Sequence, residues 1–228
     1  MNRFCTFVCV ATLAVTGAFA AKQFEFAKTP QEAKVTEHGP DKPLGKPEKT
    51  PTAGKGGWVS MFDGKTLDGW KAGEHPENWK VVDGTVTGGG PRSHLFWEKE
   101  QCQDCEWIAS VKINHNGNSG MYTRCQSIVA DWPKGYESQV NVSHKDPVKT
   151  GSLYNIVKRY DQLVRDDTWF TQRIRMEGDH IQIWVNGIQT VDTHDKTYAK
   201  GYIALQAHDP GSVMMYKDMR FRSLPVKK

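Results

Sequence analysis

The chain has 228 residues, a hydrophobic content of 38% and a formal net charge of +4 at pH 7. This length allows one large or two small domains. The excess positive charge lies near the two ends, because residues 58–224 hold 20 lysines and arginines against 21 aspartates and glutamates. This near-neutral balance gives the folded part no electrostatic reason to bind nucleic acid, and we expect no nucleic-acid partner.

Residues 1–20 have the pattern of a cleaved signal peptide. Arg3 precedes an apolar run that ends near Ala14, and small residues surround the expected cleavage point after Ala20. The apolar run is too short to cross a bilayer comfortably. We therefore predict a secreted or periplasmic protein that has no membrane partner once the signal is removed.

Residues 21–57 differ in composition from the rest of the chain. They are rich in proline and lysine, and Phe24 and Phe26 are their only aromatic residues. Such a segment buries too little apolar surface to offset the entropy lost on ordering. We predict a disordered linker that leads into a domain over residues 58–224.

The segment from Trp58 to Leu224 repeats short runs of β-branched and aromatic residues, separated by glycine, asparagine and aspartate. This pattern is typical of strands and turns. The dipeptides Asp83-Gly84 and Asn186-Gly187 are typical hairpin turns. Strands are expected in the runs at residues 58–62, 79–82, 85–87, 106–113, 121–125, 136–143, 170–176, 181–185, 201–206 and 214–222.

Many short strands over one continuous stretch favour an all-β domain, a two-sheet sandwich or jelly roll. Residues 156–164 are the one place with a helical pattern, and that pattern is weak.

Three cysteines remain after residues 1–20: Cys102, Cys105 and Cys125. In an oxidising compartment we expect a disulfide. A structural bridge is favoured over a zinc or redox site, because no second Cys-x-x-Cys or histidine pair accompanies the first. The sequence leaves the pairing open between Cys102–Cys105 and a bridge from either of them to Cys125.

Polar side chains follow one face of several expected strands. In residues 136–143, alternation places Glu137 and Gln139 opposite the more apolar face. In residues 120–125, Tyr122 and Arg124 share a face by the same rule. Such rows are also what the solvent-exposed face of an antiparallel sheet looks like.

A third row comes from residues 202–208, where Gln206 and His208 lie opposite Ile203 and Leu205. If this row joins Glu137, one sheet face gathers a base, an acid and several amides. Such a face suits a carbohydrate, which offers hydroxyl groups for hydrogen bonds.

Six motifs, in order and spanning residues 58–224, resemble the 3-keto-disaccharide hydrolase family. They are Met61-Phe-Asp-Gly-Lys-Thr-Leu-Asp-Gly-Trp70, Asn118-Ser-Gly-Met-Tyr-Thr-Arg124, Tyr136-Glu-Ser-Gln139, Gly151-Ser-Leu-Tyr154, Trp184-Val-Asn-Gly187 and Gly201-Tyr-Ile-Ala-Leu-Gln-Ala-His208. The resemblance implies a concanavalin A-like jelly roll that cleaves 3-keto-glycosides outside the cytoplasm. The chain departs from the family pattern in its cysteines, in Asp209 where a glycine is common, and in an insertion at residues 158–167.

The two-carboxylate route of retaining glycosidases needs two acids about 5 Å apart, and the strand face around Glu137 offers one. A 3-keto group permits another route, in which a base removes the C2 proton, the glycosidic oxygen leaves, and water adds back. We expect His208 to act as the base, Glu137 to donate the proton or orient the histidine, and Arg124 to hold the enolate. The sequence does not decide which of His208 and Glu137 is the base and which is the acid. The expected substrate-binding residues are Asn118, Gln139, Gln206 and Tyr122.

Other interpretations remain open. Arg124 and Glu137 are also compatible with a cross-strand salt bridge, and His208 with a loop cap through Asp209. A lectin-like module that binds glycans without turnover is the alternative function. No cofactor is expected, and metal is left unassigned, because no HxH or HxxE spacing joins Glu137 to His208.

Overall fold

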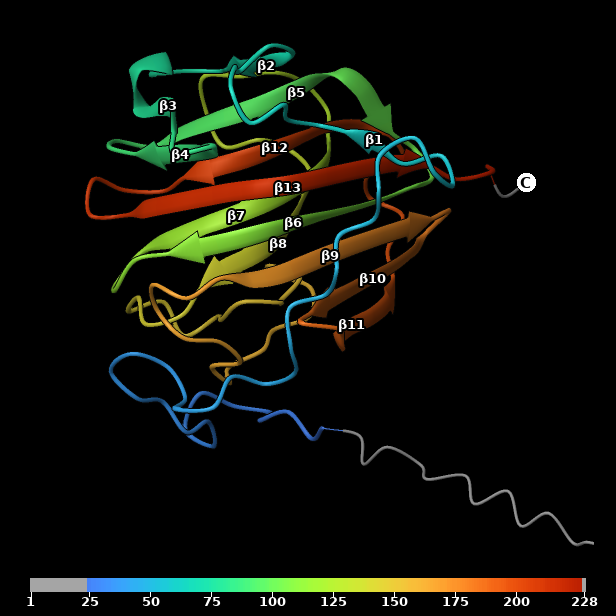
Figure 1. Cartoon of the computed structure of the whole chain (residues 1–228). Coiled ribbons are helices and arrows are strands. Elements are labelled where there is room, and N and C mark those ends of the chain that lie inside the picture. The colour runs from blue at the N-terminus through green and yellow to red at the C-terminus, as the bar shows by residue number, and fades with distance from the viewer. Residues whose placement is uncertain (1–23, 227–228) are drawn as a thin grey trace, which may run out of the picture.

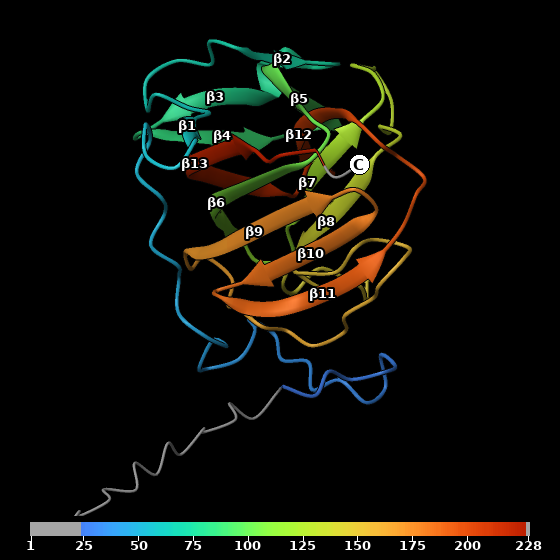
Figure 2. The same cartoon turned by 90° about the vertical axis from the view of Figure 1, so that its right-hand side faces the viewer.

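Two antiparallel sheets make up the described part of the chain (Figures 1 and 2). The computed structural model describes residues 24–226, so the signal expected at residues 1–20 lies outside the described residues. In order across the larger sheet lie β11 (Ile188–His194), β10 (His180–Val185), β9 (Phe170–Glu177), β6 (Cys105–Ile113), β13 (Val213–Ser223), β4 (Thr85–Gly89) and β3 (Trp79–Val82), with β1 (Val59–Ser60) paired to β13. In the smaller sheet lie β2 (Trp70–Ala72), β5 (Ser93–Cys102), β12 (Gly201–Ala207), β7 (Asn118–Cys125) and β8 (Tyr136–Asn141). The expected all-β, two-sheet jelly roll is confirmed.

The core lies between the two sheets. Alternate residues of each strand point inward, for example Trp107 and Val111 of β6 and Ile203 and Leu205 of β12, and all four are buried. Each fully buried apolar side chain of this size contributes about 1.5–3 kcal/mol to stability. The opposite residues of β7, β8 and β12 therefore lie on the outer face of the smaller sheet, where the polar rows were expected.

The hairpin turns form as their sequences predict. Asp83 and Gly84 both have positive φ, 47° and 71°, and so do Asn186 and Gly187, at 49° and 76°. A pair of left-handed residues is what a two-residue turn between right-twisted strands requires, and aspartate, asparagine and glycine tolerate it.

Strands β2 and β11 were not among the expected strands, and two further expectations for single elements are corrected. Strand β5 was not expected, although it is among the longest, because the charged stretch Glu98-Lys99-Glu100 hides the alternation of the residues before it. The weak helical pattern at residues 156–164 forms no helix. The described residues contain one 3₁₀ turn, η1 (Pro76–Asn78), and no helix long and apolar enough to span a membrane.

The cysteine pairing is Cys102–Cys105, across the tight connection from β5 to β6. Cys125 is buried and free. Of the pairings that the sequence left open, the structure therefore contains the most local one.

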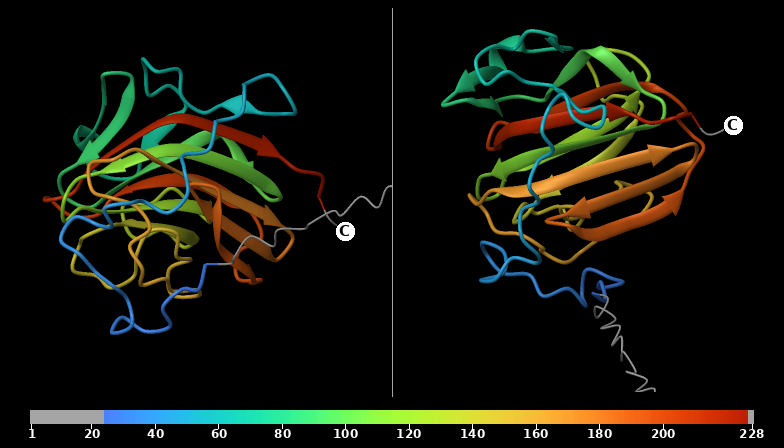
Figure 3. Two further views of the ribbon diagram at one scale, coloured as in Figure 1. Left: turned by 60° about the horizontal axis from the view of Figure 1, so that its bottom comes forward. Right: turned by 45° about the vertical axis from the view of Figure 1, so that its right-hand side comes forward.

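The segment expected to be a disordered linker lies along the domain in the described residues 24–57 (Figure 3). It forms no strand or helix, but its backbone is bound to the domain: Leu44 N–H donates to Leu163 O at 2.7 Å and Thr36 N–H to Gln162 Oε1 at 2.7 Å. Side chains of Phe26 and Leu44 pack against the core. The prediction of disorder is wrong for these residues, because composition does not show that the insertion at 158–167 supplies a docking surface.

Candidate functional site

A cavity of about 410 Å³ opens on the outer face of the smaller sheet. Strands β7, β8 and β12 supply its floor, and loops after β7, β8 and β12 supply its walls. This volume suits a small ligand. The lining residues are Asn118, Tyr122, Trp132, Pro133, Gly135, Glu137, Gln139, Asp146, Tyr154, Asn155, Gln206 and His208.

Strand register brings residues distant in sequence together in this floor. Tyr122 of β7 lies opposite Glu137 of β8 and beside Ala204 of β12. Gly120 leaves room for the carboxyl group, since a Cβ at that position would collide with the Glu137 side chain. This explains why the motif around Asn118 carries a glycine between Asn118 and Tyr122, its neighbours on the same face of the strand.

Glu137 is half-buried in the floor, where the Tyr122 hydroxyl donates to its Oε2 at 2.8 Å. The amide of Gln206 in turn donates to the Tyr122 oxygen at 3.0 Å. Burial disfavours the charged carboxylate and raises its pKa to about 7, the hydrogen bond from Tyr122 opposes this shift, and the nearby charge of Asp146 adds to it. Glu137 can therefore give or take a proton near neutral pH.

His208 lies at the rim with its Nδ1 bonded to Asp209 Oδ2 at 2.9 Å. Burial tends to raise the pKa of Asp209, but hydrogen bonds from His208 and Ser212 hold it below its ordinary value. A carboxylate at Nδ1 fixes the ring orientation and leaves Nε2 as the free nitrogen. His208 therefore makes the expected loop contact with Asp209 and also lines the cavity.

Two amide side chains that line the cavity carry acceptor atoms without a partner. Asn118 Oδ1 and Gln206 Oε1 are buried and have no hydrogen-bond partner among the described residues. Buried polar atoms are usually paired, so an orphan in a cavity wall indicates a ligand or water position. Gln139 differs, because its amide is engaged by the backbone at Val148 and Val140.

The expectation that Arg124 shares this cavity is wrong. Its guanidinium is buried elsewhere, donating to the carbonyl oxygens of Gln103 and of Tyr198 and lying 3.5 Å from Asp104. Arg124 has a φ of 59°, and the β7–β12 register shifts at this point.

This β-bulge breaks the alternation on which the expectation rested. Beyond it, Cys125 lies on the same outer cluster as Tyr122, three residues away. The cross-strand Arg124–Glu137 salt bridge is likewise not formed, and Glu137 has no ion pair with any described residue.

Trp132, Asp146 and Tyr154 also line the cavity, and no strand pattern assigns them to it, because they lie on loops. Trp132 is 46% exposed and its ring centroid lies 5.4 Å from that of His208. Tyr154 donates from its hydroxyl to Asp146 Oδ2 at 3.2 Å. Loop residues carry no periodic pattern that would assign them to one face.

His94 is a buried residue of β5, a strand that was not expected, and it pairs in register with Gln206. Its ring contacts Tyr122 and Trp132, at centroid distances of 5.2 and 5.6 Å. Burial lowers its pKa to about 3, so the ring is neutral. Had β5 been recognised, its alternation would have placed His94 and Phe96 on the outer face.

The model of the 3-keto-alpha-glucoside-1,2-lyase-like domain matches residues 57–227. The chain belongs to this family. The resemblance to 3-keto-disaccharide hydrolases is thereby confirmed, over nearly the span that the six motifs indicated. No curated protein is detectably similar to the chain in sequence.

Solved structures with the same fold include three carbohydrate-related proteins. A candidate glycosyl hydrolase from Parabacteroides distasonis is 20% identical, with a TM-score of 0.64 over 74% of this chain and 94% of that one. A carbohydrate-binding module from Bacillus subtilis is 15% identical, with a TM-score of 0.56 over 68% and 96%. A β-glucanase from Bacillus licheniformis is 10% identical, with a TM-score of 0.54 over 75% and 100%. At these identities the likeness shows the fold alone.

Proposed function

We propose that this protein cleaves 3-keto-glycosides by removing the C2 proton and eliminating the C1 oxygen. One observation carries the proposal: the carboxyl group of Glu137, whose pKa is raised to about 7, and the imidazole of His208 line one cavity in a member of this family. Elimination needs a base and an acid placed around one sugar ring.

In this proposal His208 is the base and Glu137 the acid. Asp209 holds Nδ1 of His208, so that Nε2 takes the C2 proton. As the C2–H electron pair forms the C1=C2 double bond, the C1–O bond breaks and protonated Glu137 donates to the leaving oxygen. Its pKa of about 7 keeps a large fraction of Glu137 protonated at neutral pH. Water then adds across the double bond, which gives net hydrolysis.

The amides would bind hydroxyl groups of the sugar. Asn118 Oδ1 and Gln206 Oε1 can accept from sugar hydroxyl groups, since neither has a protein partner. Trp132 offers an exposed aromatic face at the rim, against which a ring C–H face packs.

Asp146 supports a second candidate, direct hydrolysis of an unoxidised glycoside. It is a second carboxylate in the same cavity, and its charge raises the pKa of Glu137. Two carboxyl groups around a glycosidic bond are what ordinary glycosidases use. Asp146, however, accepts from Tyr154, and its backbone carbonyl is held by Lys149 at 2.8 Å, which points to a structural part in the loop.

We also propose that the protein acts outside the cytoplasm. The leader-like pattern of residues 1–20 supports this, and so does the Cys102–Cys105 disulfide, since such bonds persist in oxidising compartments.

The test is a matched pair of substrates that differ at one carbon. The protein, residues 21–228, is incubated with a 3-keto-disaccharide and with the same disaccharide bearing a C3 hydroxyl, and released monosaccharide is measured. Release from the keto sugar alone supports the elimination route. Release from both favours direct hydrolysis, and binding of either without release would make the protein a lectin-like module.

A further inference from the structure

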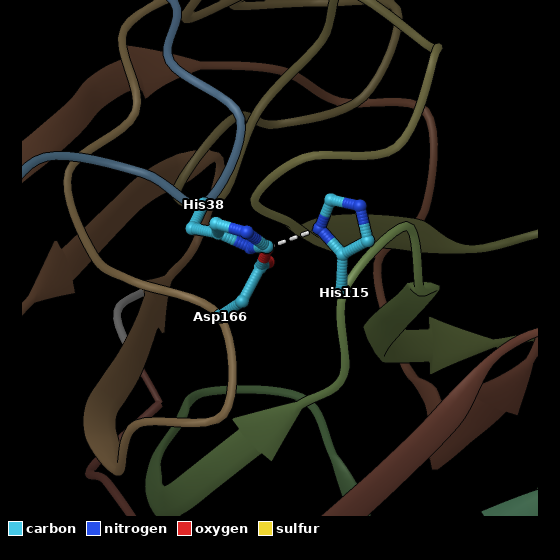
Figure 4. A group of neighbouring side chains, drawn as sticks. All are labelled: His38, His115 and Asp166. Carbon is cyan, nitrogen blue, oxygen red and sulfur yellow. Dashed lines mark hydrogen bonds and ion pairs between the residues drawn. The ribbon is translucent and has the colours of Figure 1, made fainter.

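A cluster of three metal-binding side chains lies outside the cavity, where the N-terminal segment meets the domain. His38 comes from that segment, His115 from the turn between β6 and β7, and Asp166 from the loop before β9 (Figure 4). Their donor atoms lie within 4.8 Å of one another. No part of the proposed reaction uses these residues.

The three side chains converge on one carboxylate oxygen. His115 Nδ1 lies 2.8 Å and His38 Nδ1 3.4 Å from Asp166 Oδ2. Donors around a tetrahedral zinc ion are separated by about 3.3 Å, given metal–ligand distances of 2.0–2.2 Å. The His38–Asp166 spacing already matches this, and the His115–Asp166 spacing needs to open by about 0.5 Å.

Asp166 is held as a metal-ligating carboxylate usually is. Its side chain is 3% exposed, and no lysine or arginine among the described residues lies within ion-pair distance of it. Ser143 Oγ donates to the other oxygen, Oδ1, at 2.9 Å, which turns Oδ2 toward the two imidazoles. A buried carboxylate needs a positive partner, and such an outer hydrogen bond orients it toward one.

Backbone contacts fix both sides of the cluster before any ion binds. Asp166 N–H donates to His38 O at 3.0 Å, and Gln162 binds Thr36 through both its amide oxygen and its amide nitrogen. Gly39, at a φ of 84°, lies so close to Val164 O that a Cβ would not fit. His38 is therefore held at the domain surface with its ring beside that of His115, at a centroid distance of 4.5 Å.

We propose that His38, His115 and Asp166 bind one divalent transition-metal ion, best Zn²⁺, which fastens the N-terminal segment to the domain. Two imidazoles and one carboxylate are ligands that zinc accepts, whereas Ca²⁺ and Mg²⁺ prefer all-oxygen sites. The ion also joins the turn before Asn118, which carries His115, to the loop before β9, which carries Asp166.

The test measures zinc binding to the metal-stripped protein, residues 21–228, by titration calorimetry. We expect one Zn²⁺ per chain, no heat with Ca²⁺ or Mg²⁺, a tetrahedral absorption spectrum with Co²⁺, and a rise in Tm of about 5 °C at saturating zinc. His38→Asn and His115→Ala should each weaken zinc binding by at least about tenfold.

His75→Asn is the matched control, since His75 is also half-exposed beside a carboxylate, Glu77, and lies outside the cluster. It should bind zinc as the wild type does. The proposal is overturned if the wild type binds no stoichiometric zinc, or if His38→Asn, shown to be folded by circular dichroism, binds it undiminished. In either case the cluster is a hydrogen-bonded one, with Asp166 accepting from the two imidazoles. Glycoside turnover is measured separately, so its outcome does not affect this one.

Discussion

The hydroxyl of Tyr122 donates to the Glu137 carboxylate at 2.8 Å, and this bond joins neighbouring strands in the floor of the cavity. The bond favours the charged form of Glu137 and so works against the burial that raises its pKa to about 7. The protonation state of Glu137 is therefore adjustable through Tyr122.

Tyr122→Phe should shift the pH dependence of turnover. Without the hydroxyl, the pKa of Glu137 rises further, so the alkaline limb of kcat should move up by about 0.5–1 pH unit. The measurement is a pH–rate profile of both proteins on a 3-keto-disaccharide. If the alkaline limb does not move, that limb reports the titration of a group other than Glu137.

Glu137→Gln should lower kcat by about 10²–10⁴, because glutamine cannot donate a proton to the leaving oxygen yet still accepts from Tyr122. A carboxyl group introduced at position 139 should not replace that of Glu137, since the Gln139 side chain is hydrogen-bonded to the backbone. Near-wild-type turnover by Glu137→Gln would remove Glu137 from the mechanism.

The same substitution should stabilise the fold at alkaline pH. Because the pKa of Glu137 is raised from 4.5 to about 7, the folded protein binds a proton that the unfolded chain releases within this window. Stability contributed by this group is full below pH 4.5 and is lost as pH rises toward 7. At pH 8, Glu137→Gln should therefore gain up to about 3 kcal/mol in free energy of unfolding, and at pH 4 little. Urea unfolding at both pH values checks this, and equal effects at the two would contradict it.

Arg124→Ala tests whether Arg124 has a structural role outside the cavity instead of the catalytic role expected from the sequence. Removing a buried guanidinium that binds two carbonyl oxygens should cost about 2–4 kcal/mol of stability, while kcat per folded molecule stays close to that of the wild type. Arg165→Ala, at an exposed pair with Asp41, is the control and should cost under about 1 kcal/mol. A stable Arg124 variant with lost turnover would restore its catalytic role.

Thiol titration distinguishes Cys125 from the bridged cysteines. Burial raises the pKa of the Cys125 thiol, so it should not react with a thiol reagent in native protein of residues 21–228. Unfolding without reductant should expose one thiol per chain, and unfolding with reductant three. A native thiol signal would show that Cys125 is accessible.

The strand pattern predicted the parts of the fold that depend on local periodicity. The faces predicted for residues 136–143 are correct because β8 is regular. Glu137 faces the cavity and Val140 faces the core. The face predicted for Arg124 is wrong for a local reason. The bulge in β7 interrupts the alternation of side chains, and the alternation rule does not anticipate bulges. His94 was not among the expected site residues, because the charged end of β5 hid the strand to which it belongs.

Other features depend on contacts between distant segments. Trp132 and Asp146 reach the cavity from loops, and the strands alone do not place them there. The N-terminal segment is ordered by partners more than a hundred residues away, as the Thr36–Gln162 bonds show. Composition indicates how much apolar surface a segment can bury by itself. It does not indicate which contacts a distant segment provides.

The most direct test of the central claim, that this cavity removes a C2 proton, is turnover of a 3-keto-disaccharide deuterated at C2. Wild-type protein should release monosaccharide more slowly from the deuterated than from the ordinary substrate, and His208→Asn should release almost none from either. Equal rates for the two substrates, together with full activity of His208→Asn, would contradict the elimination mechanism and the assignment of His208 as its base.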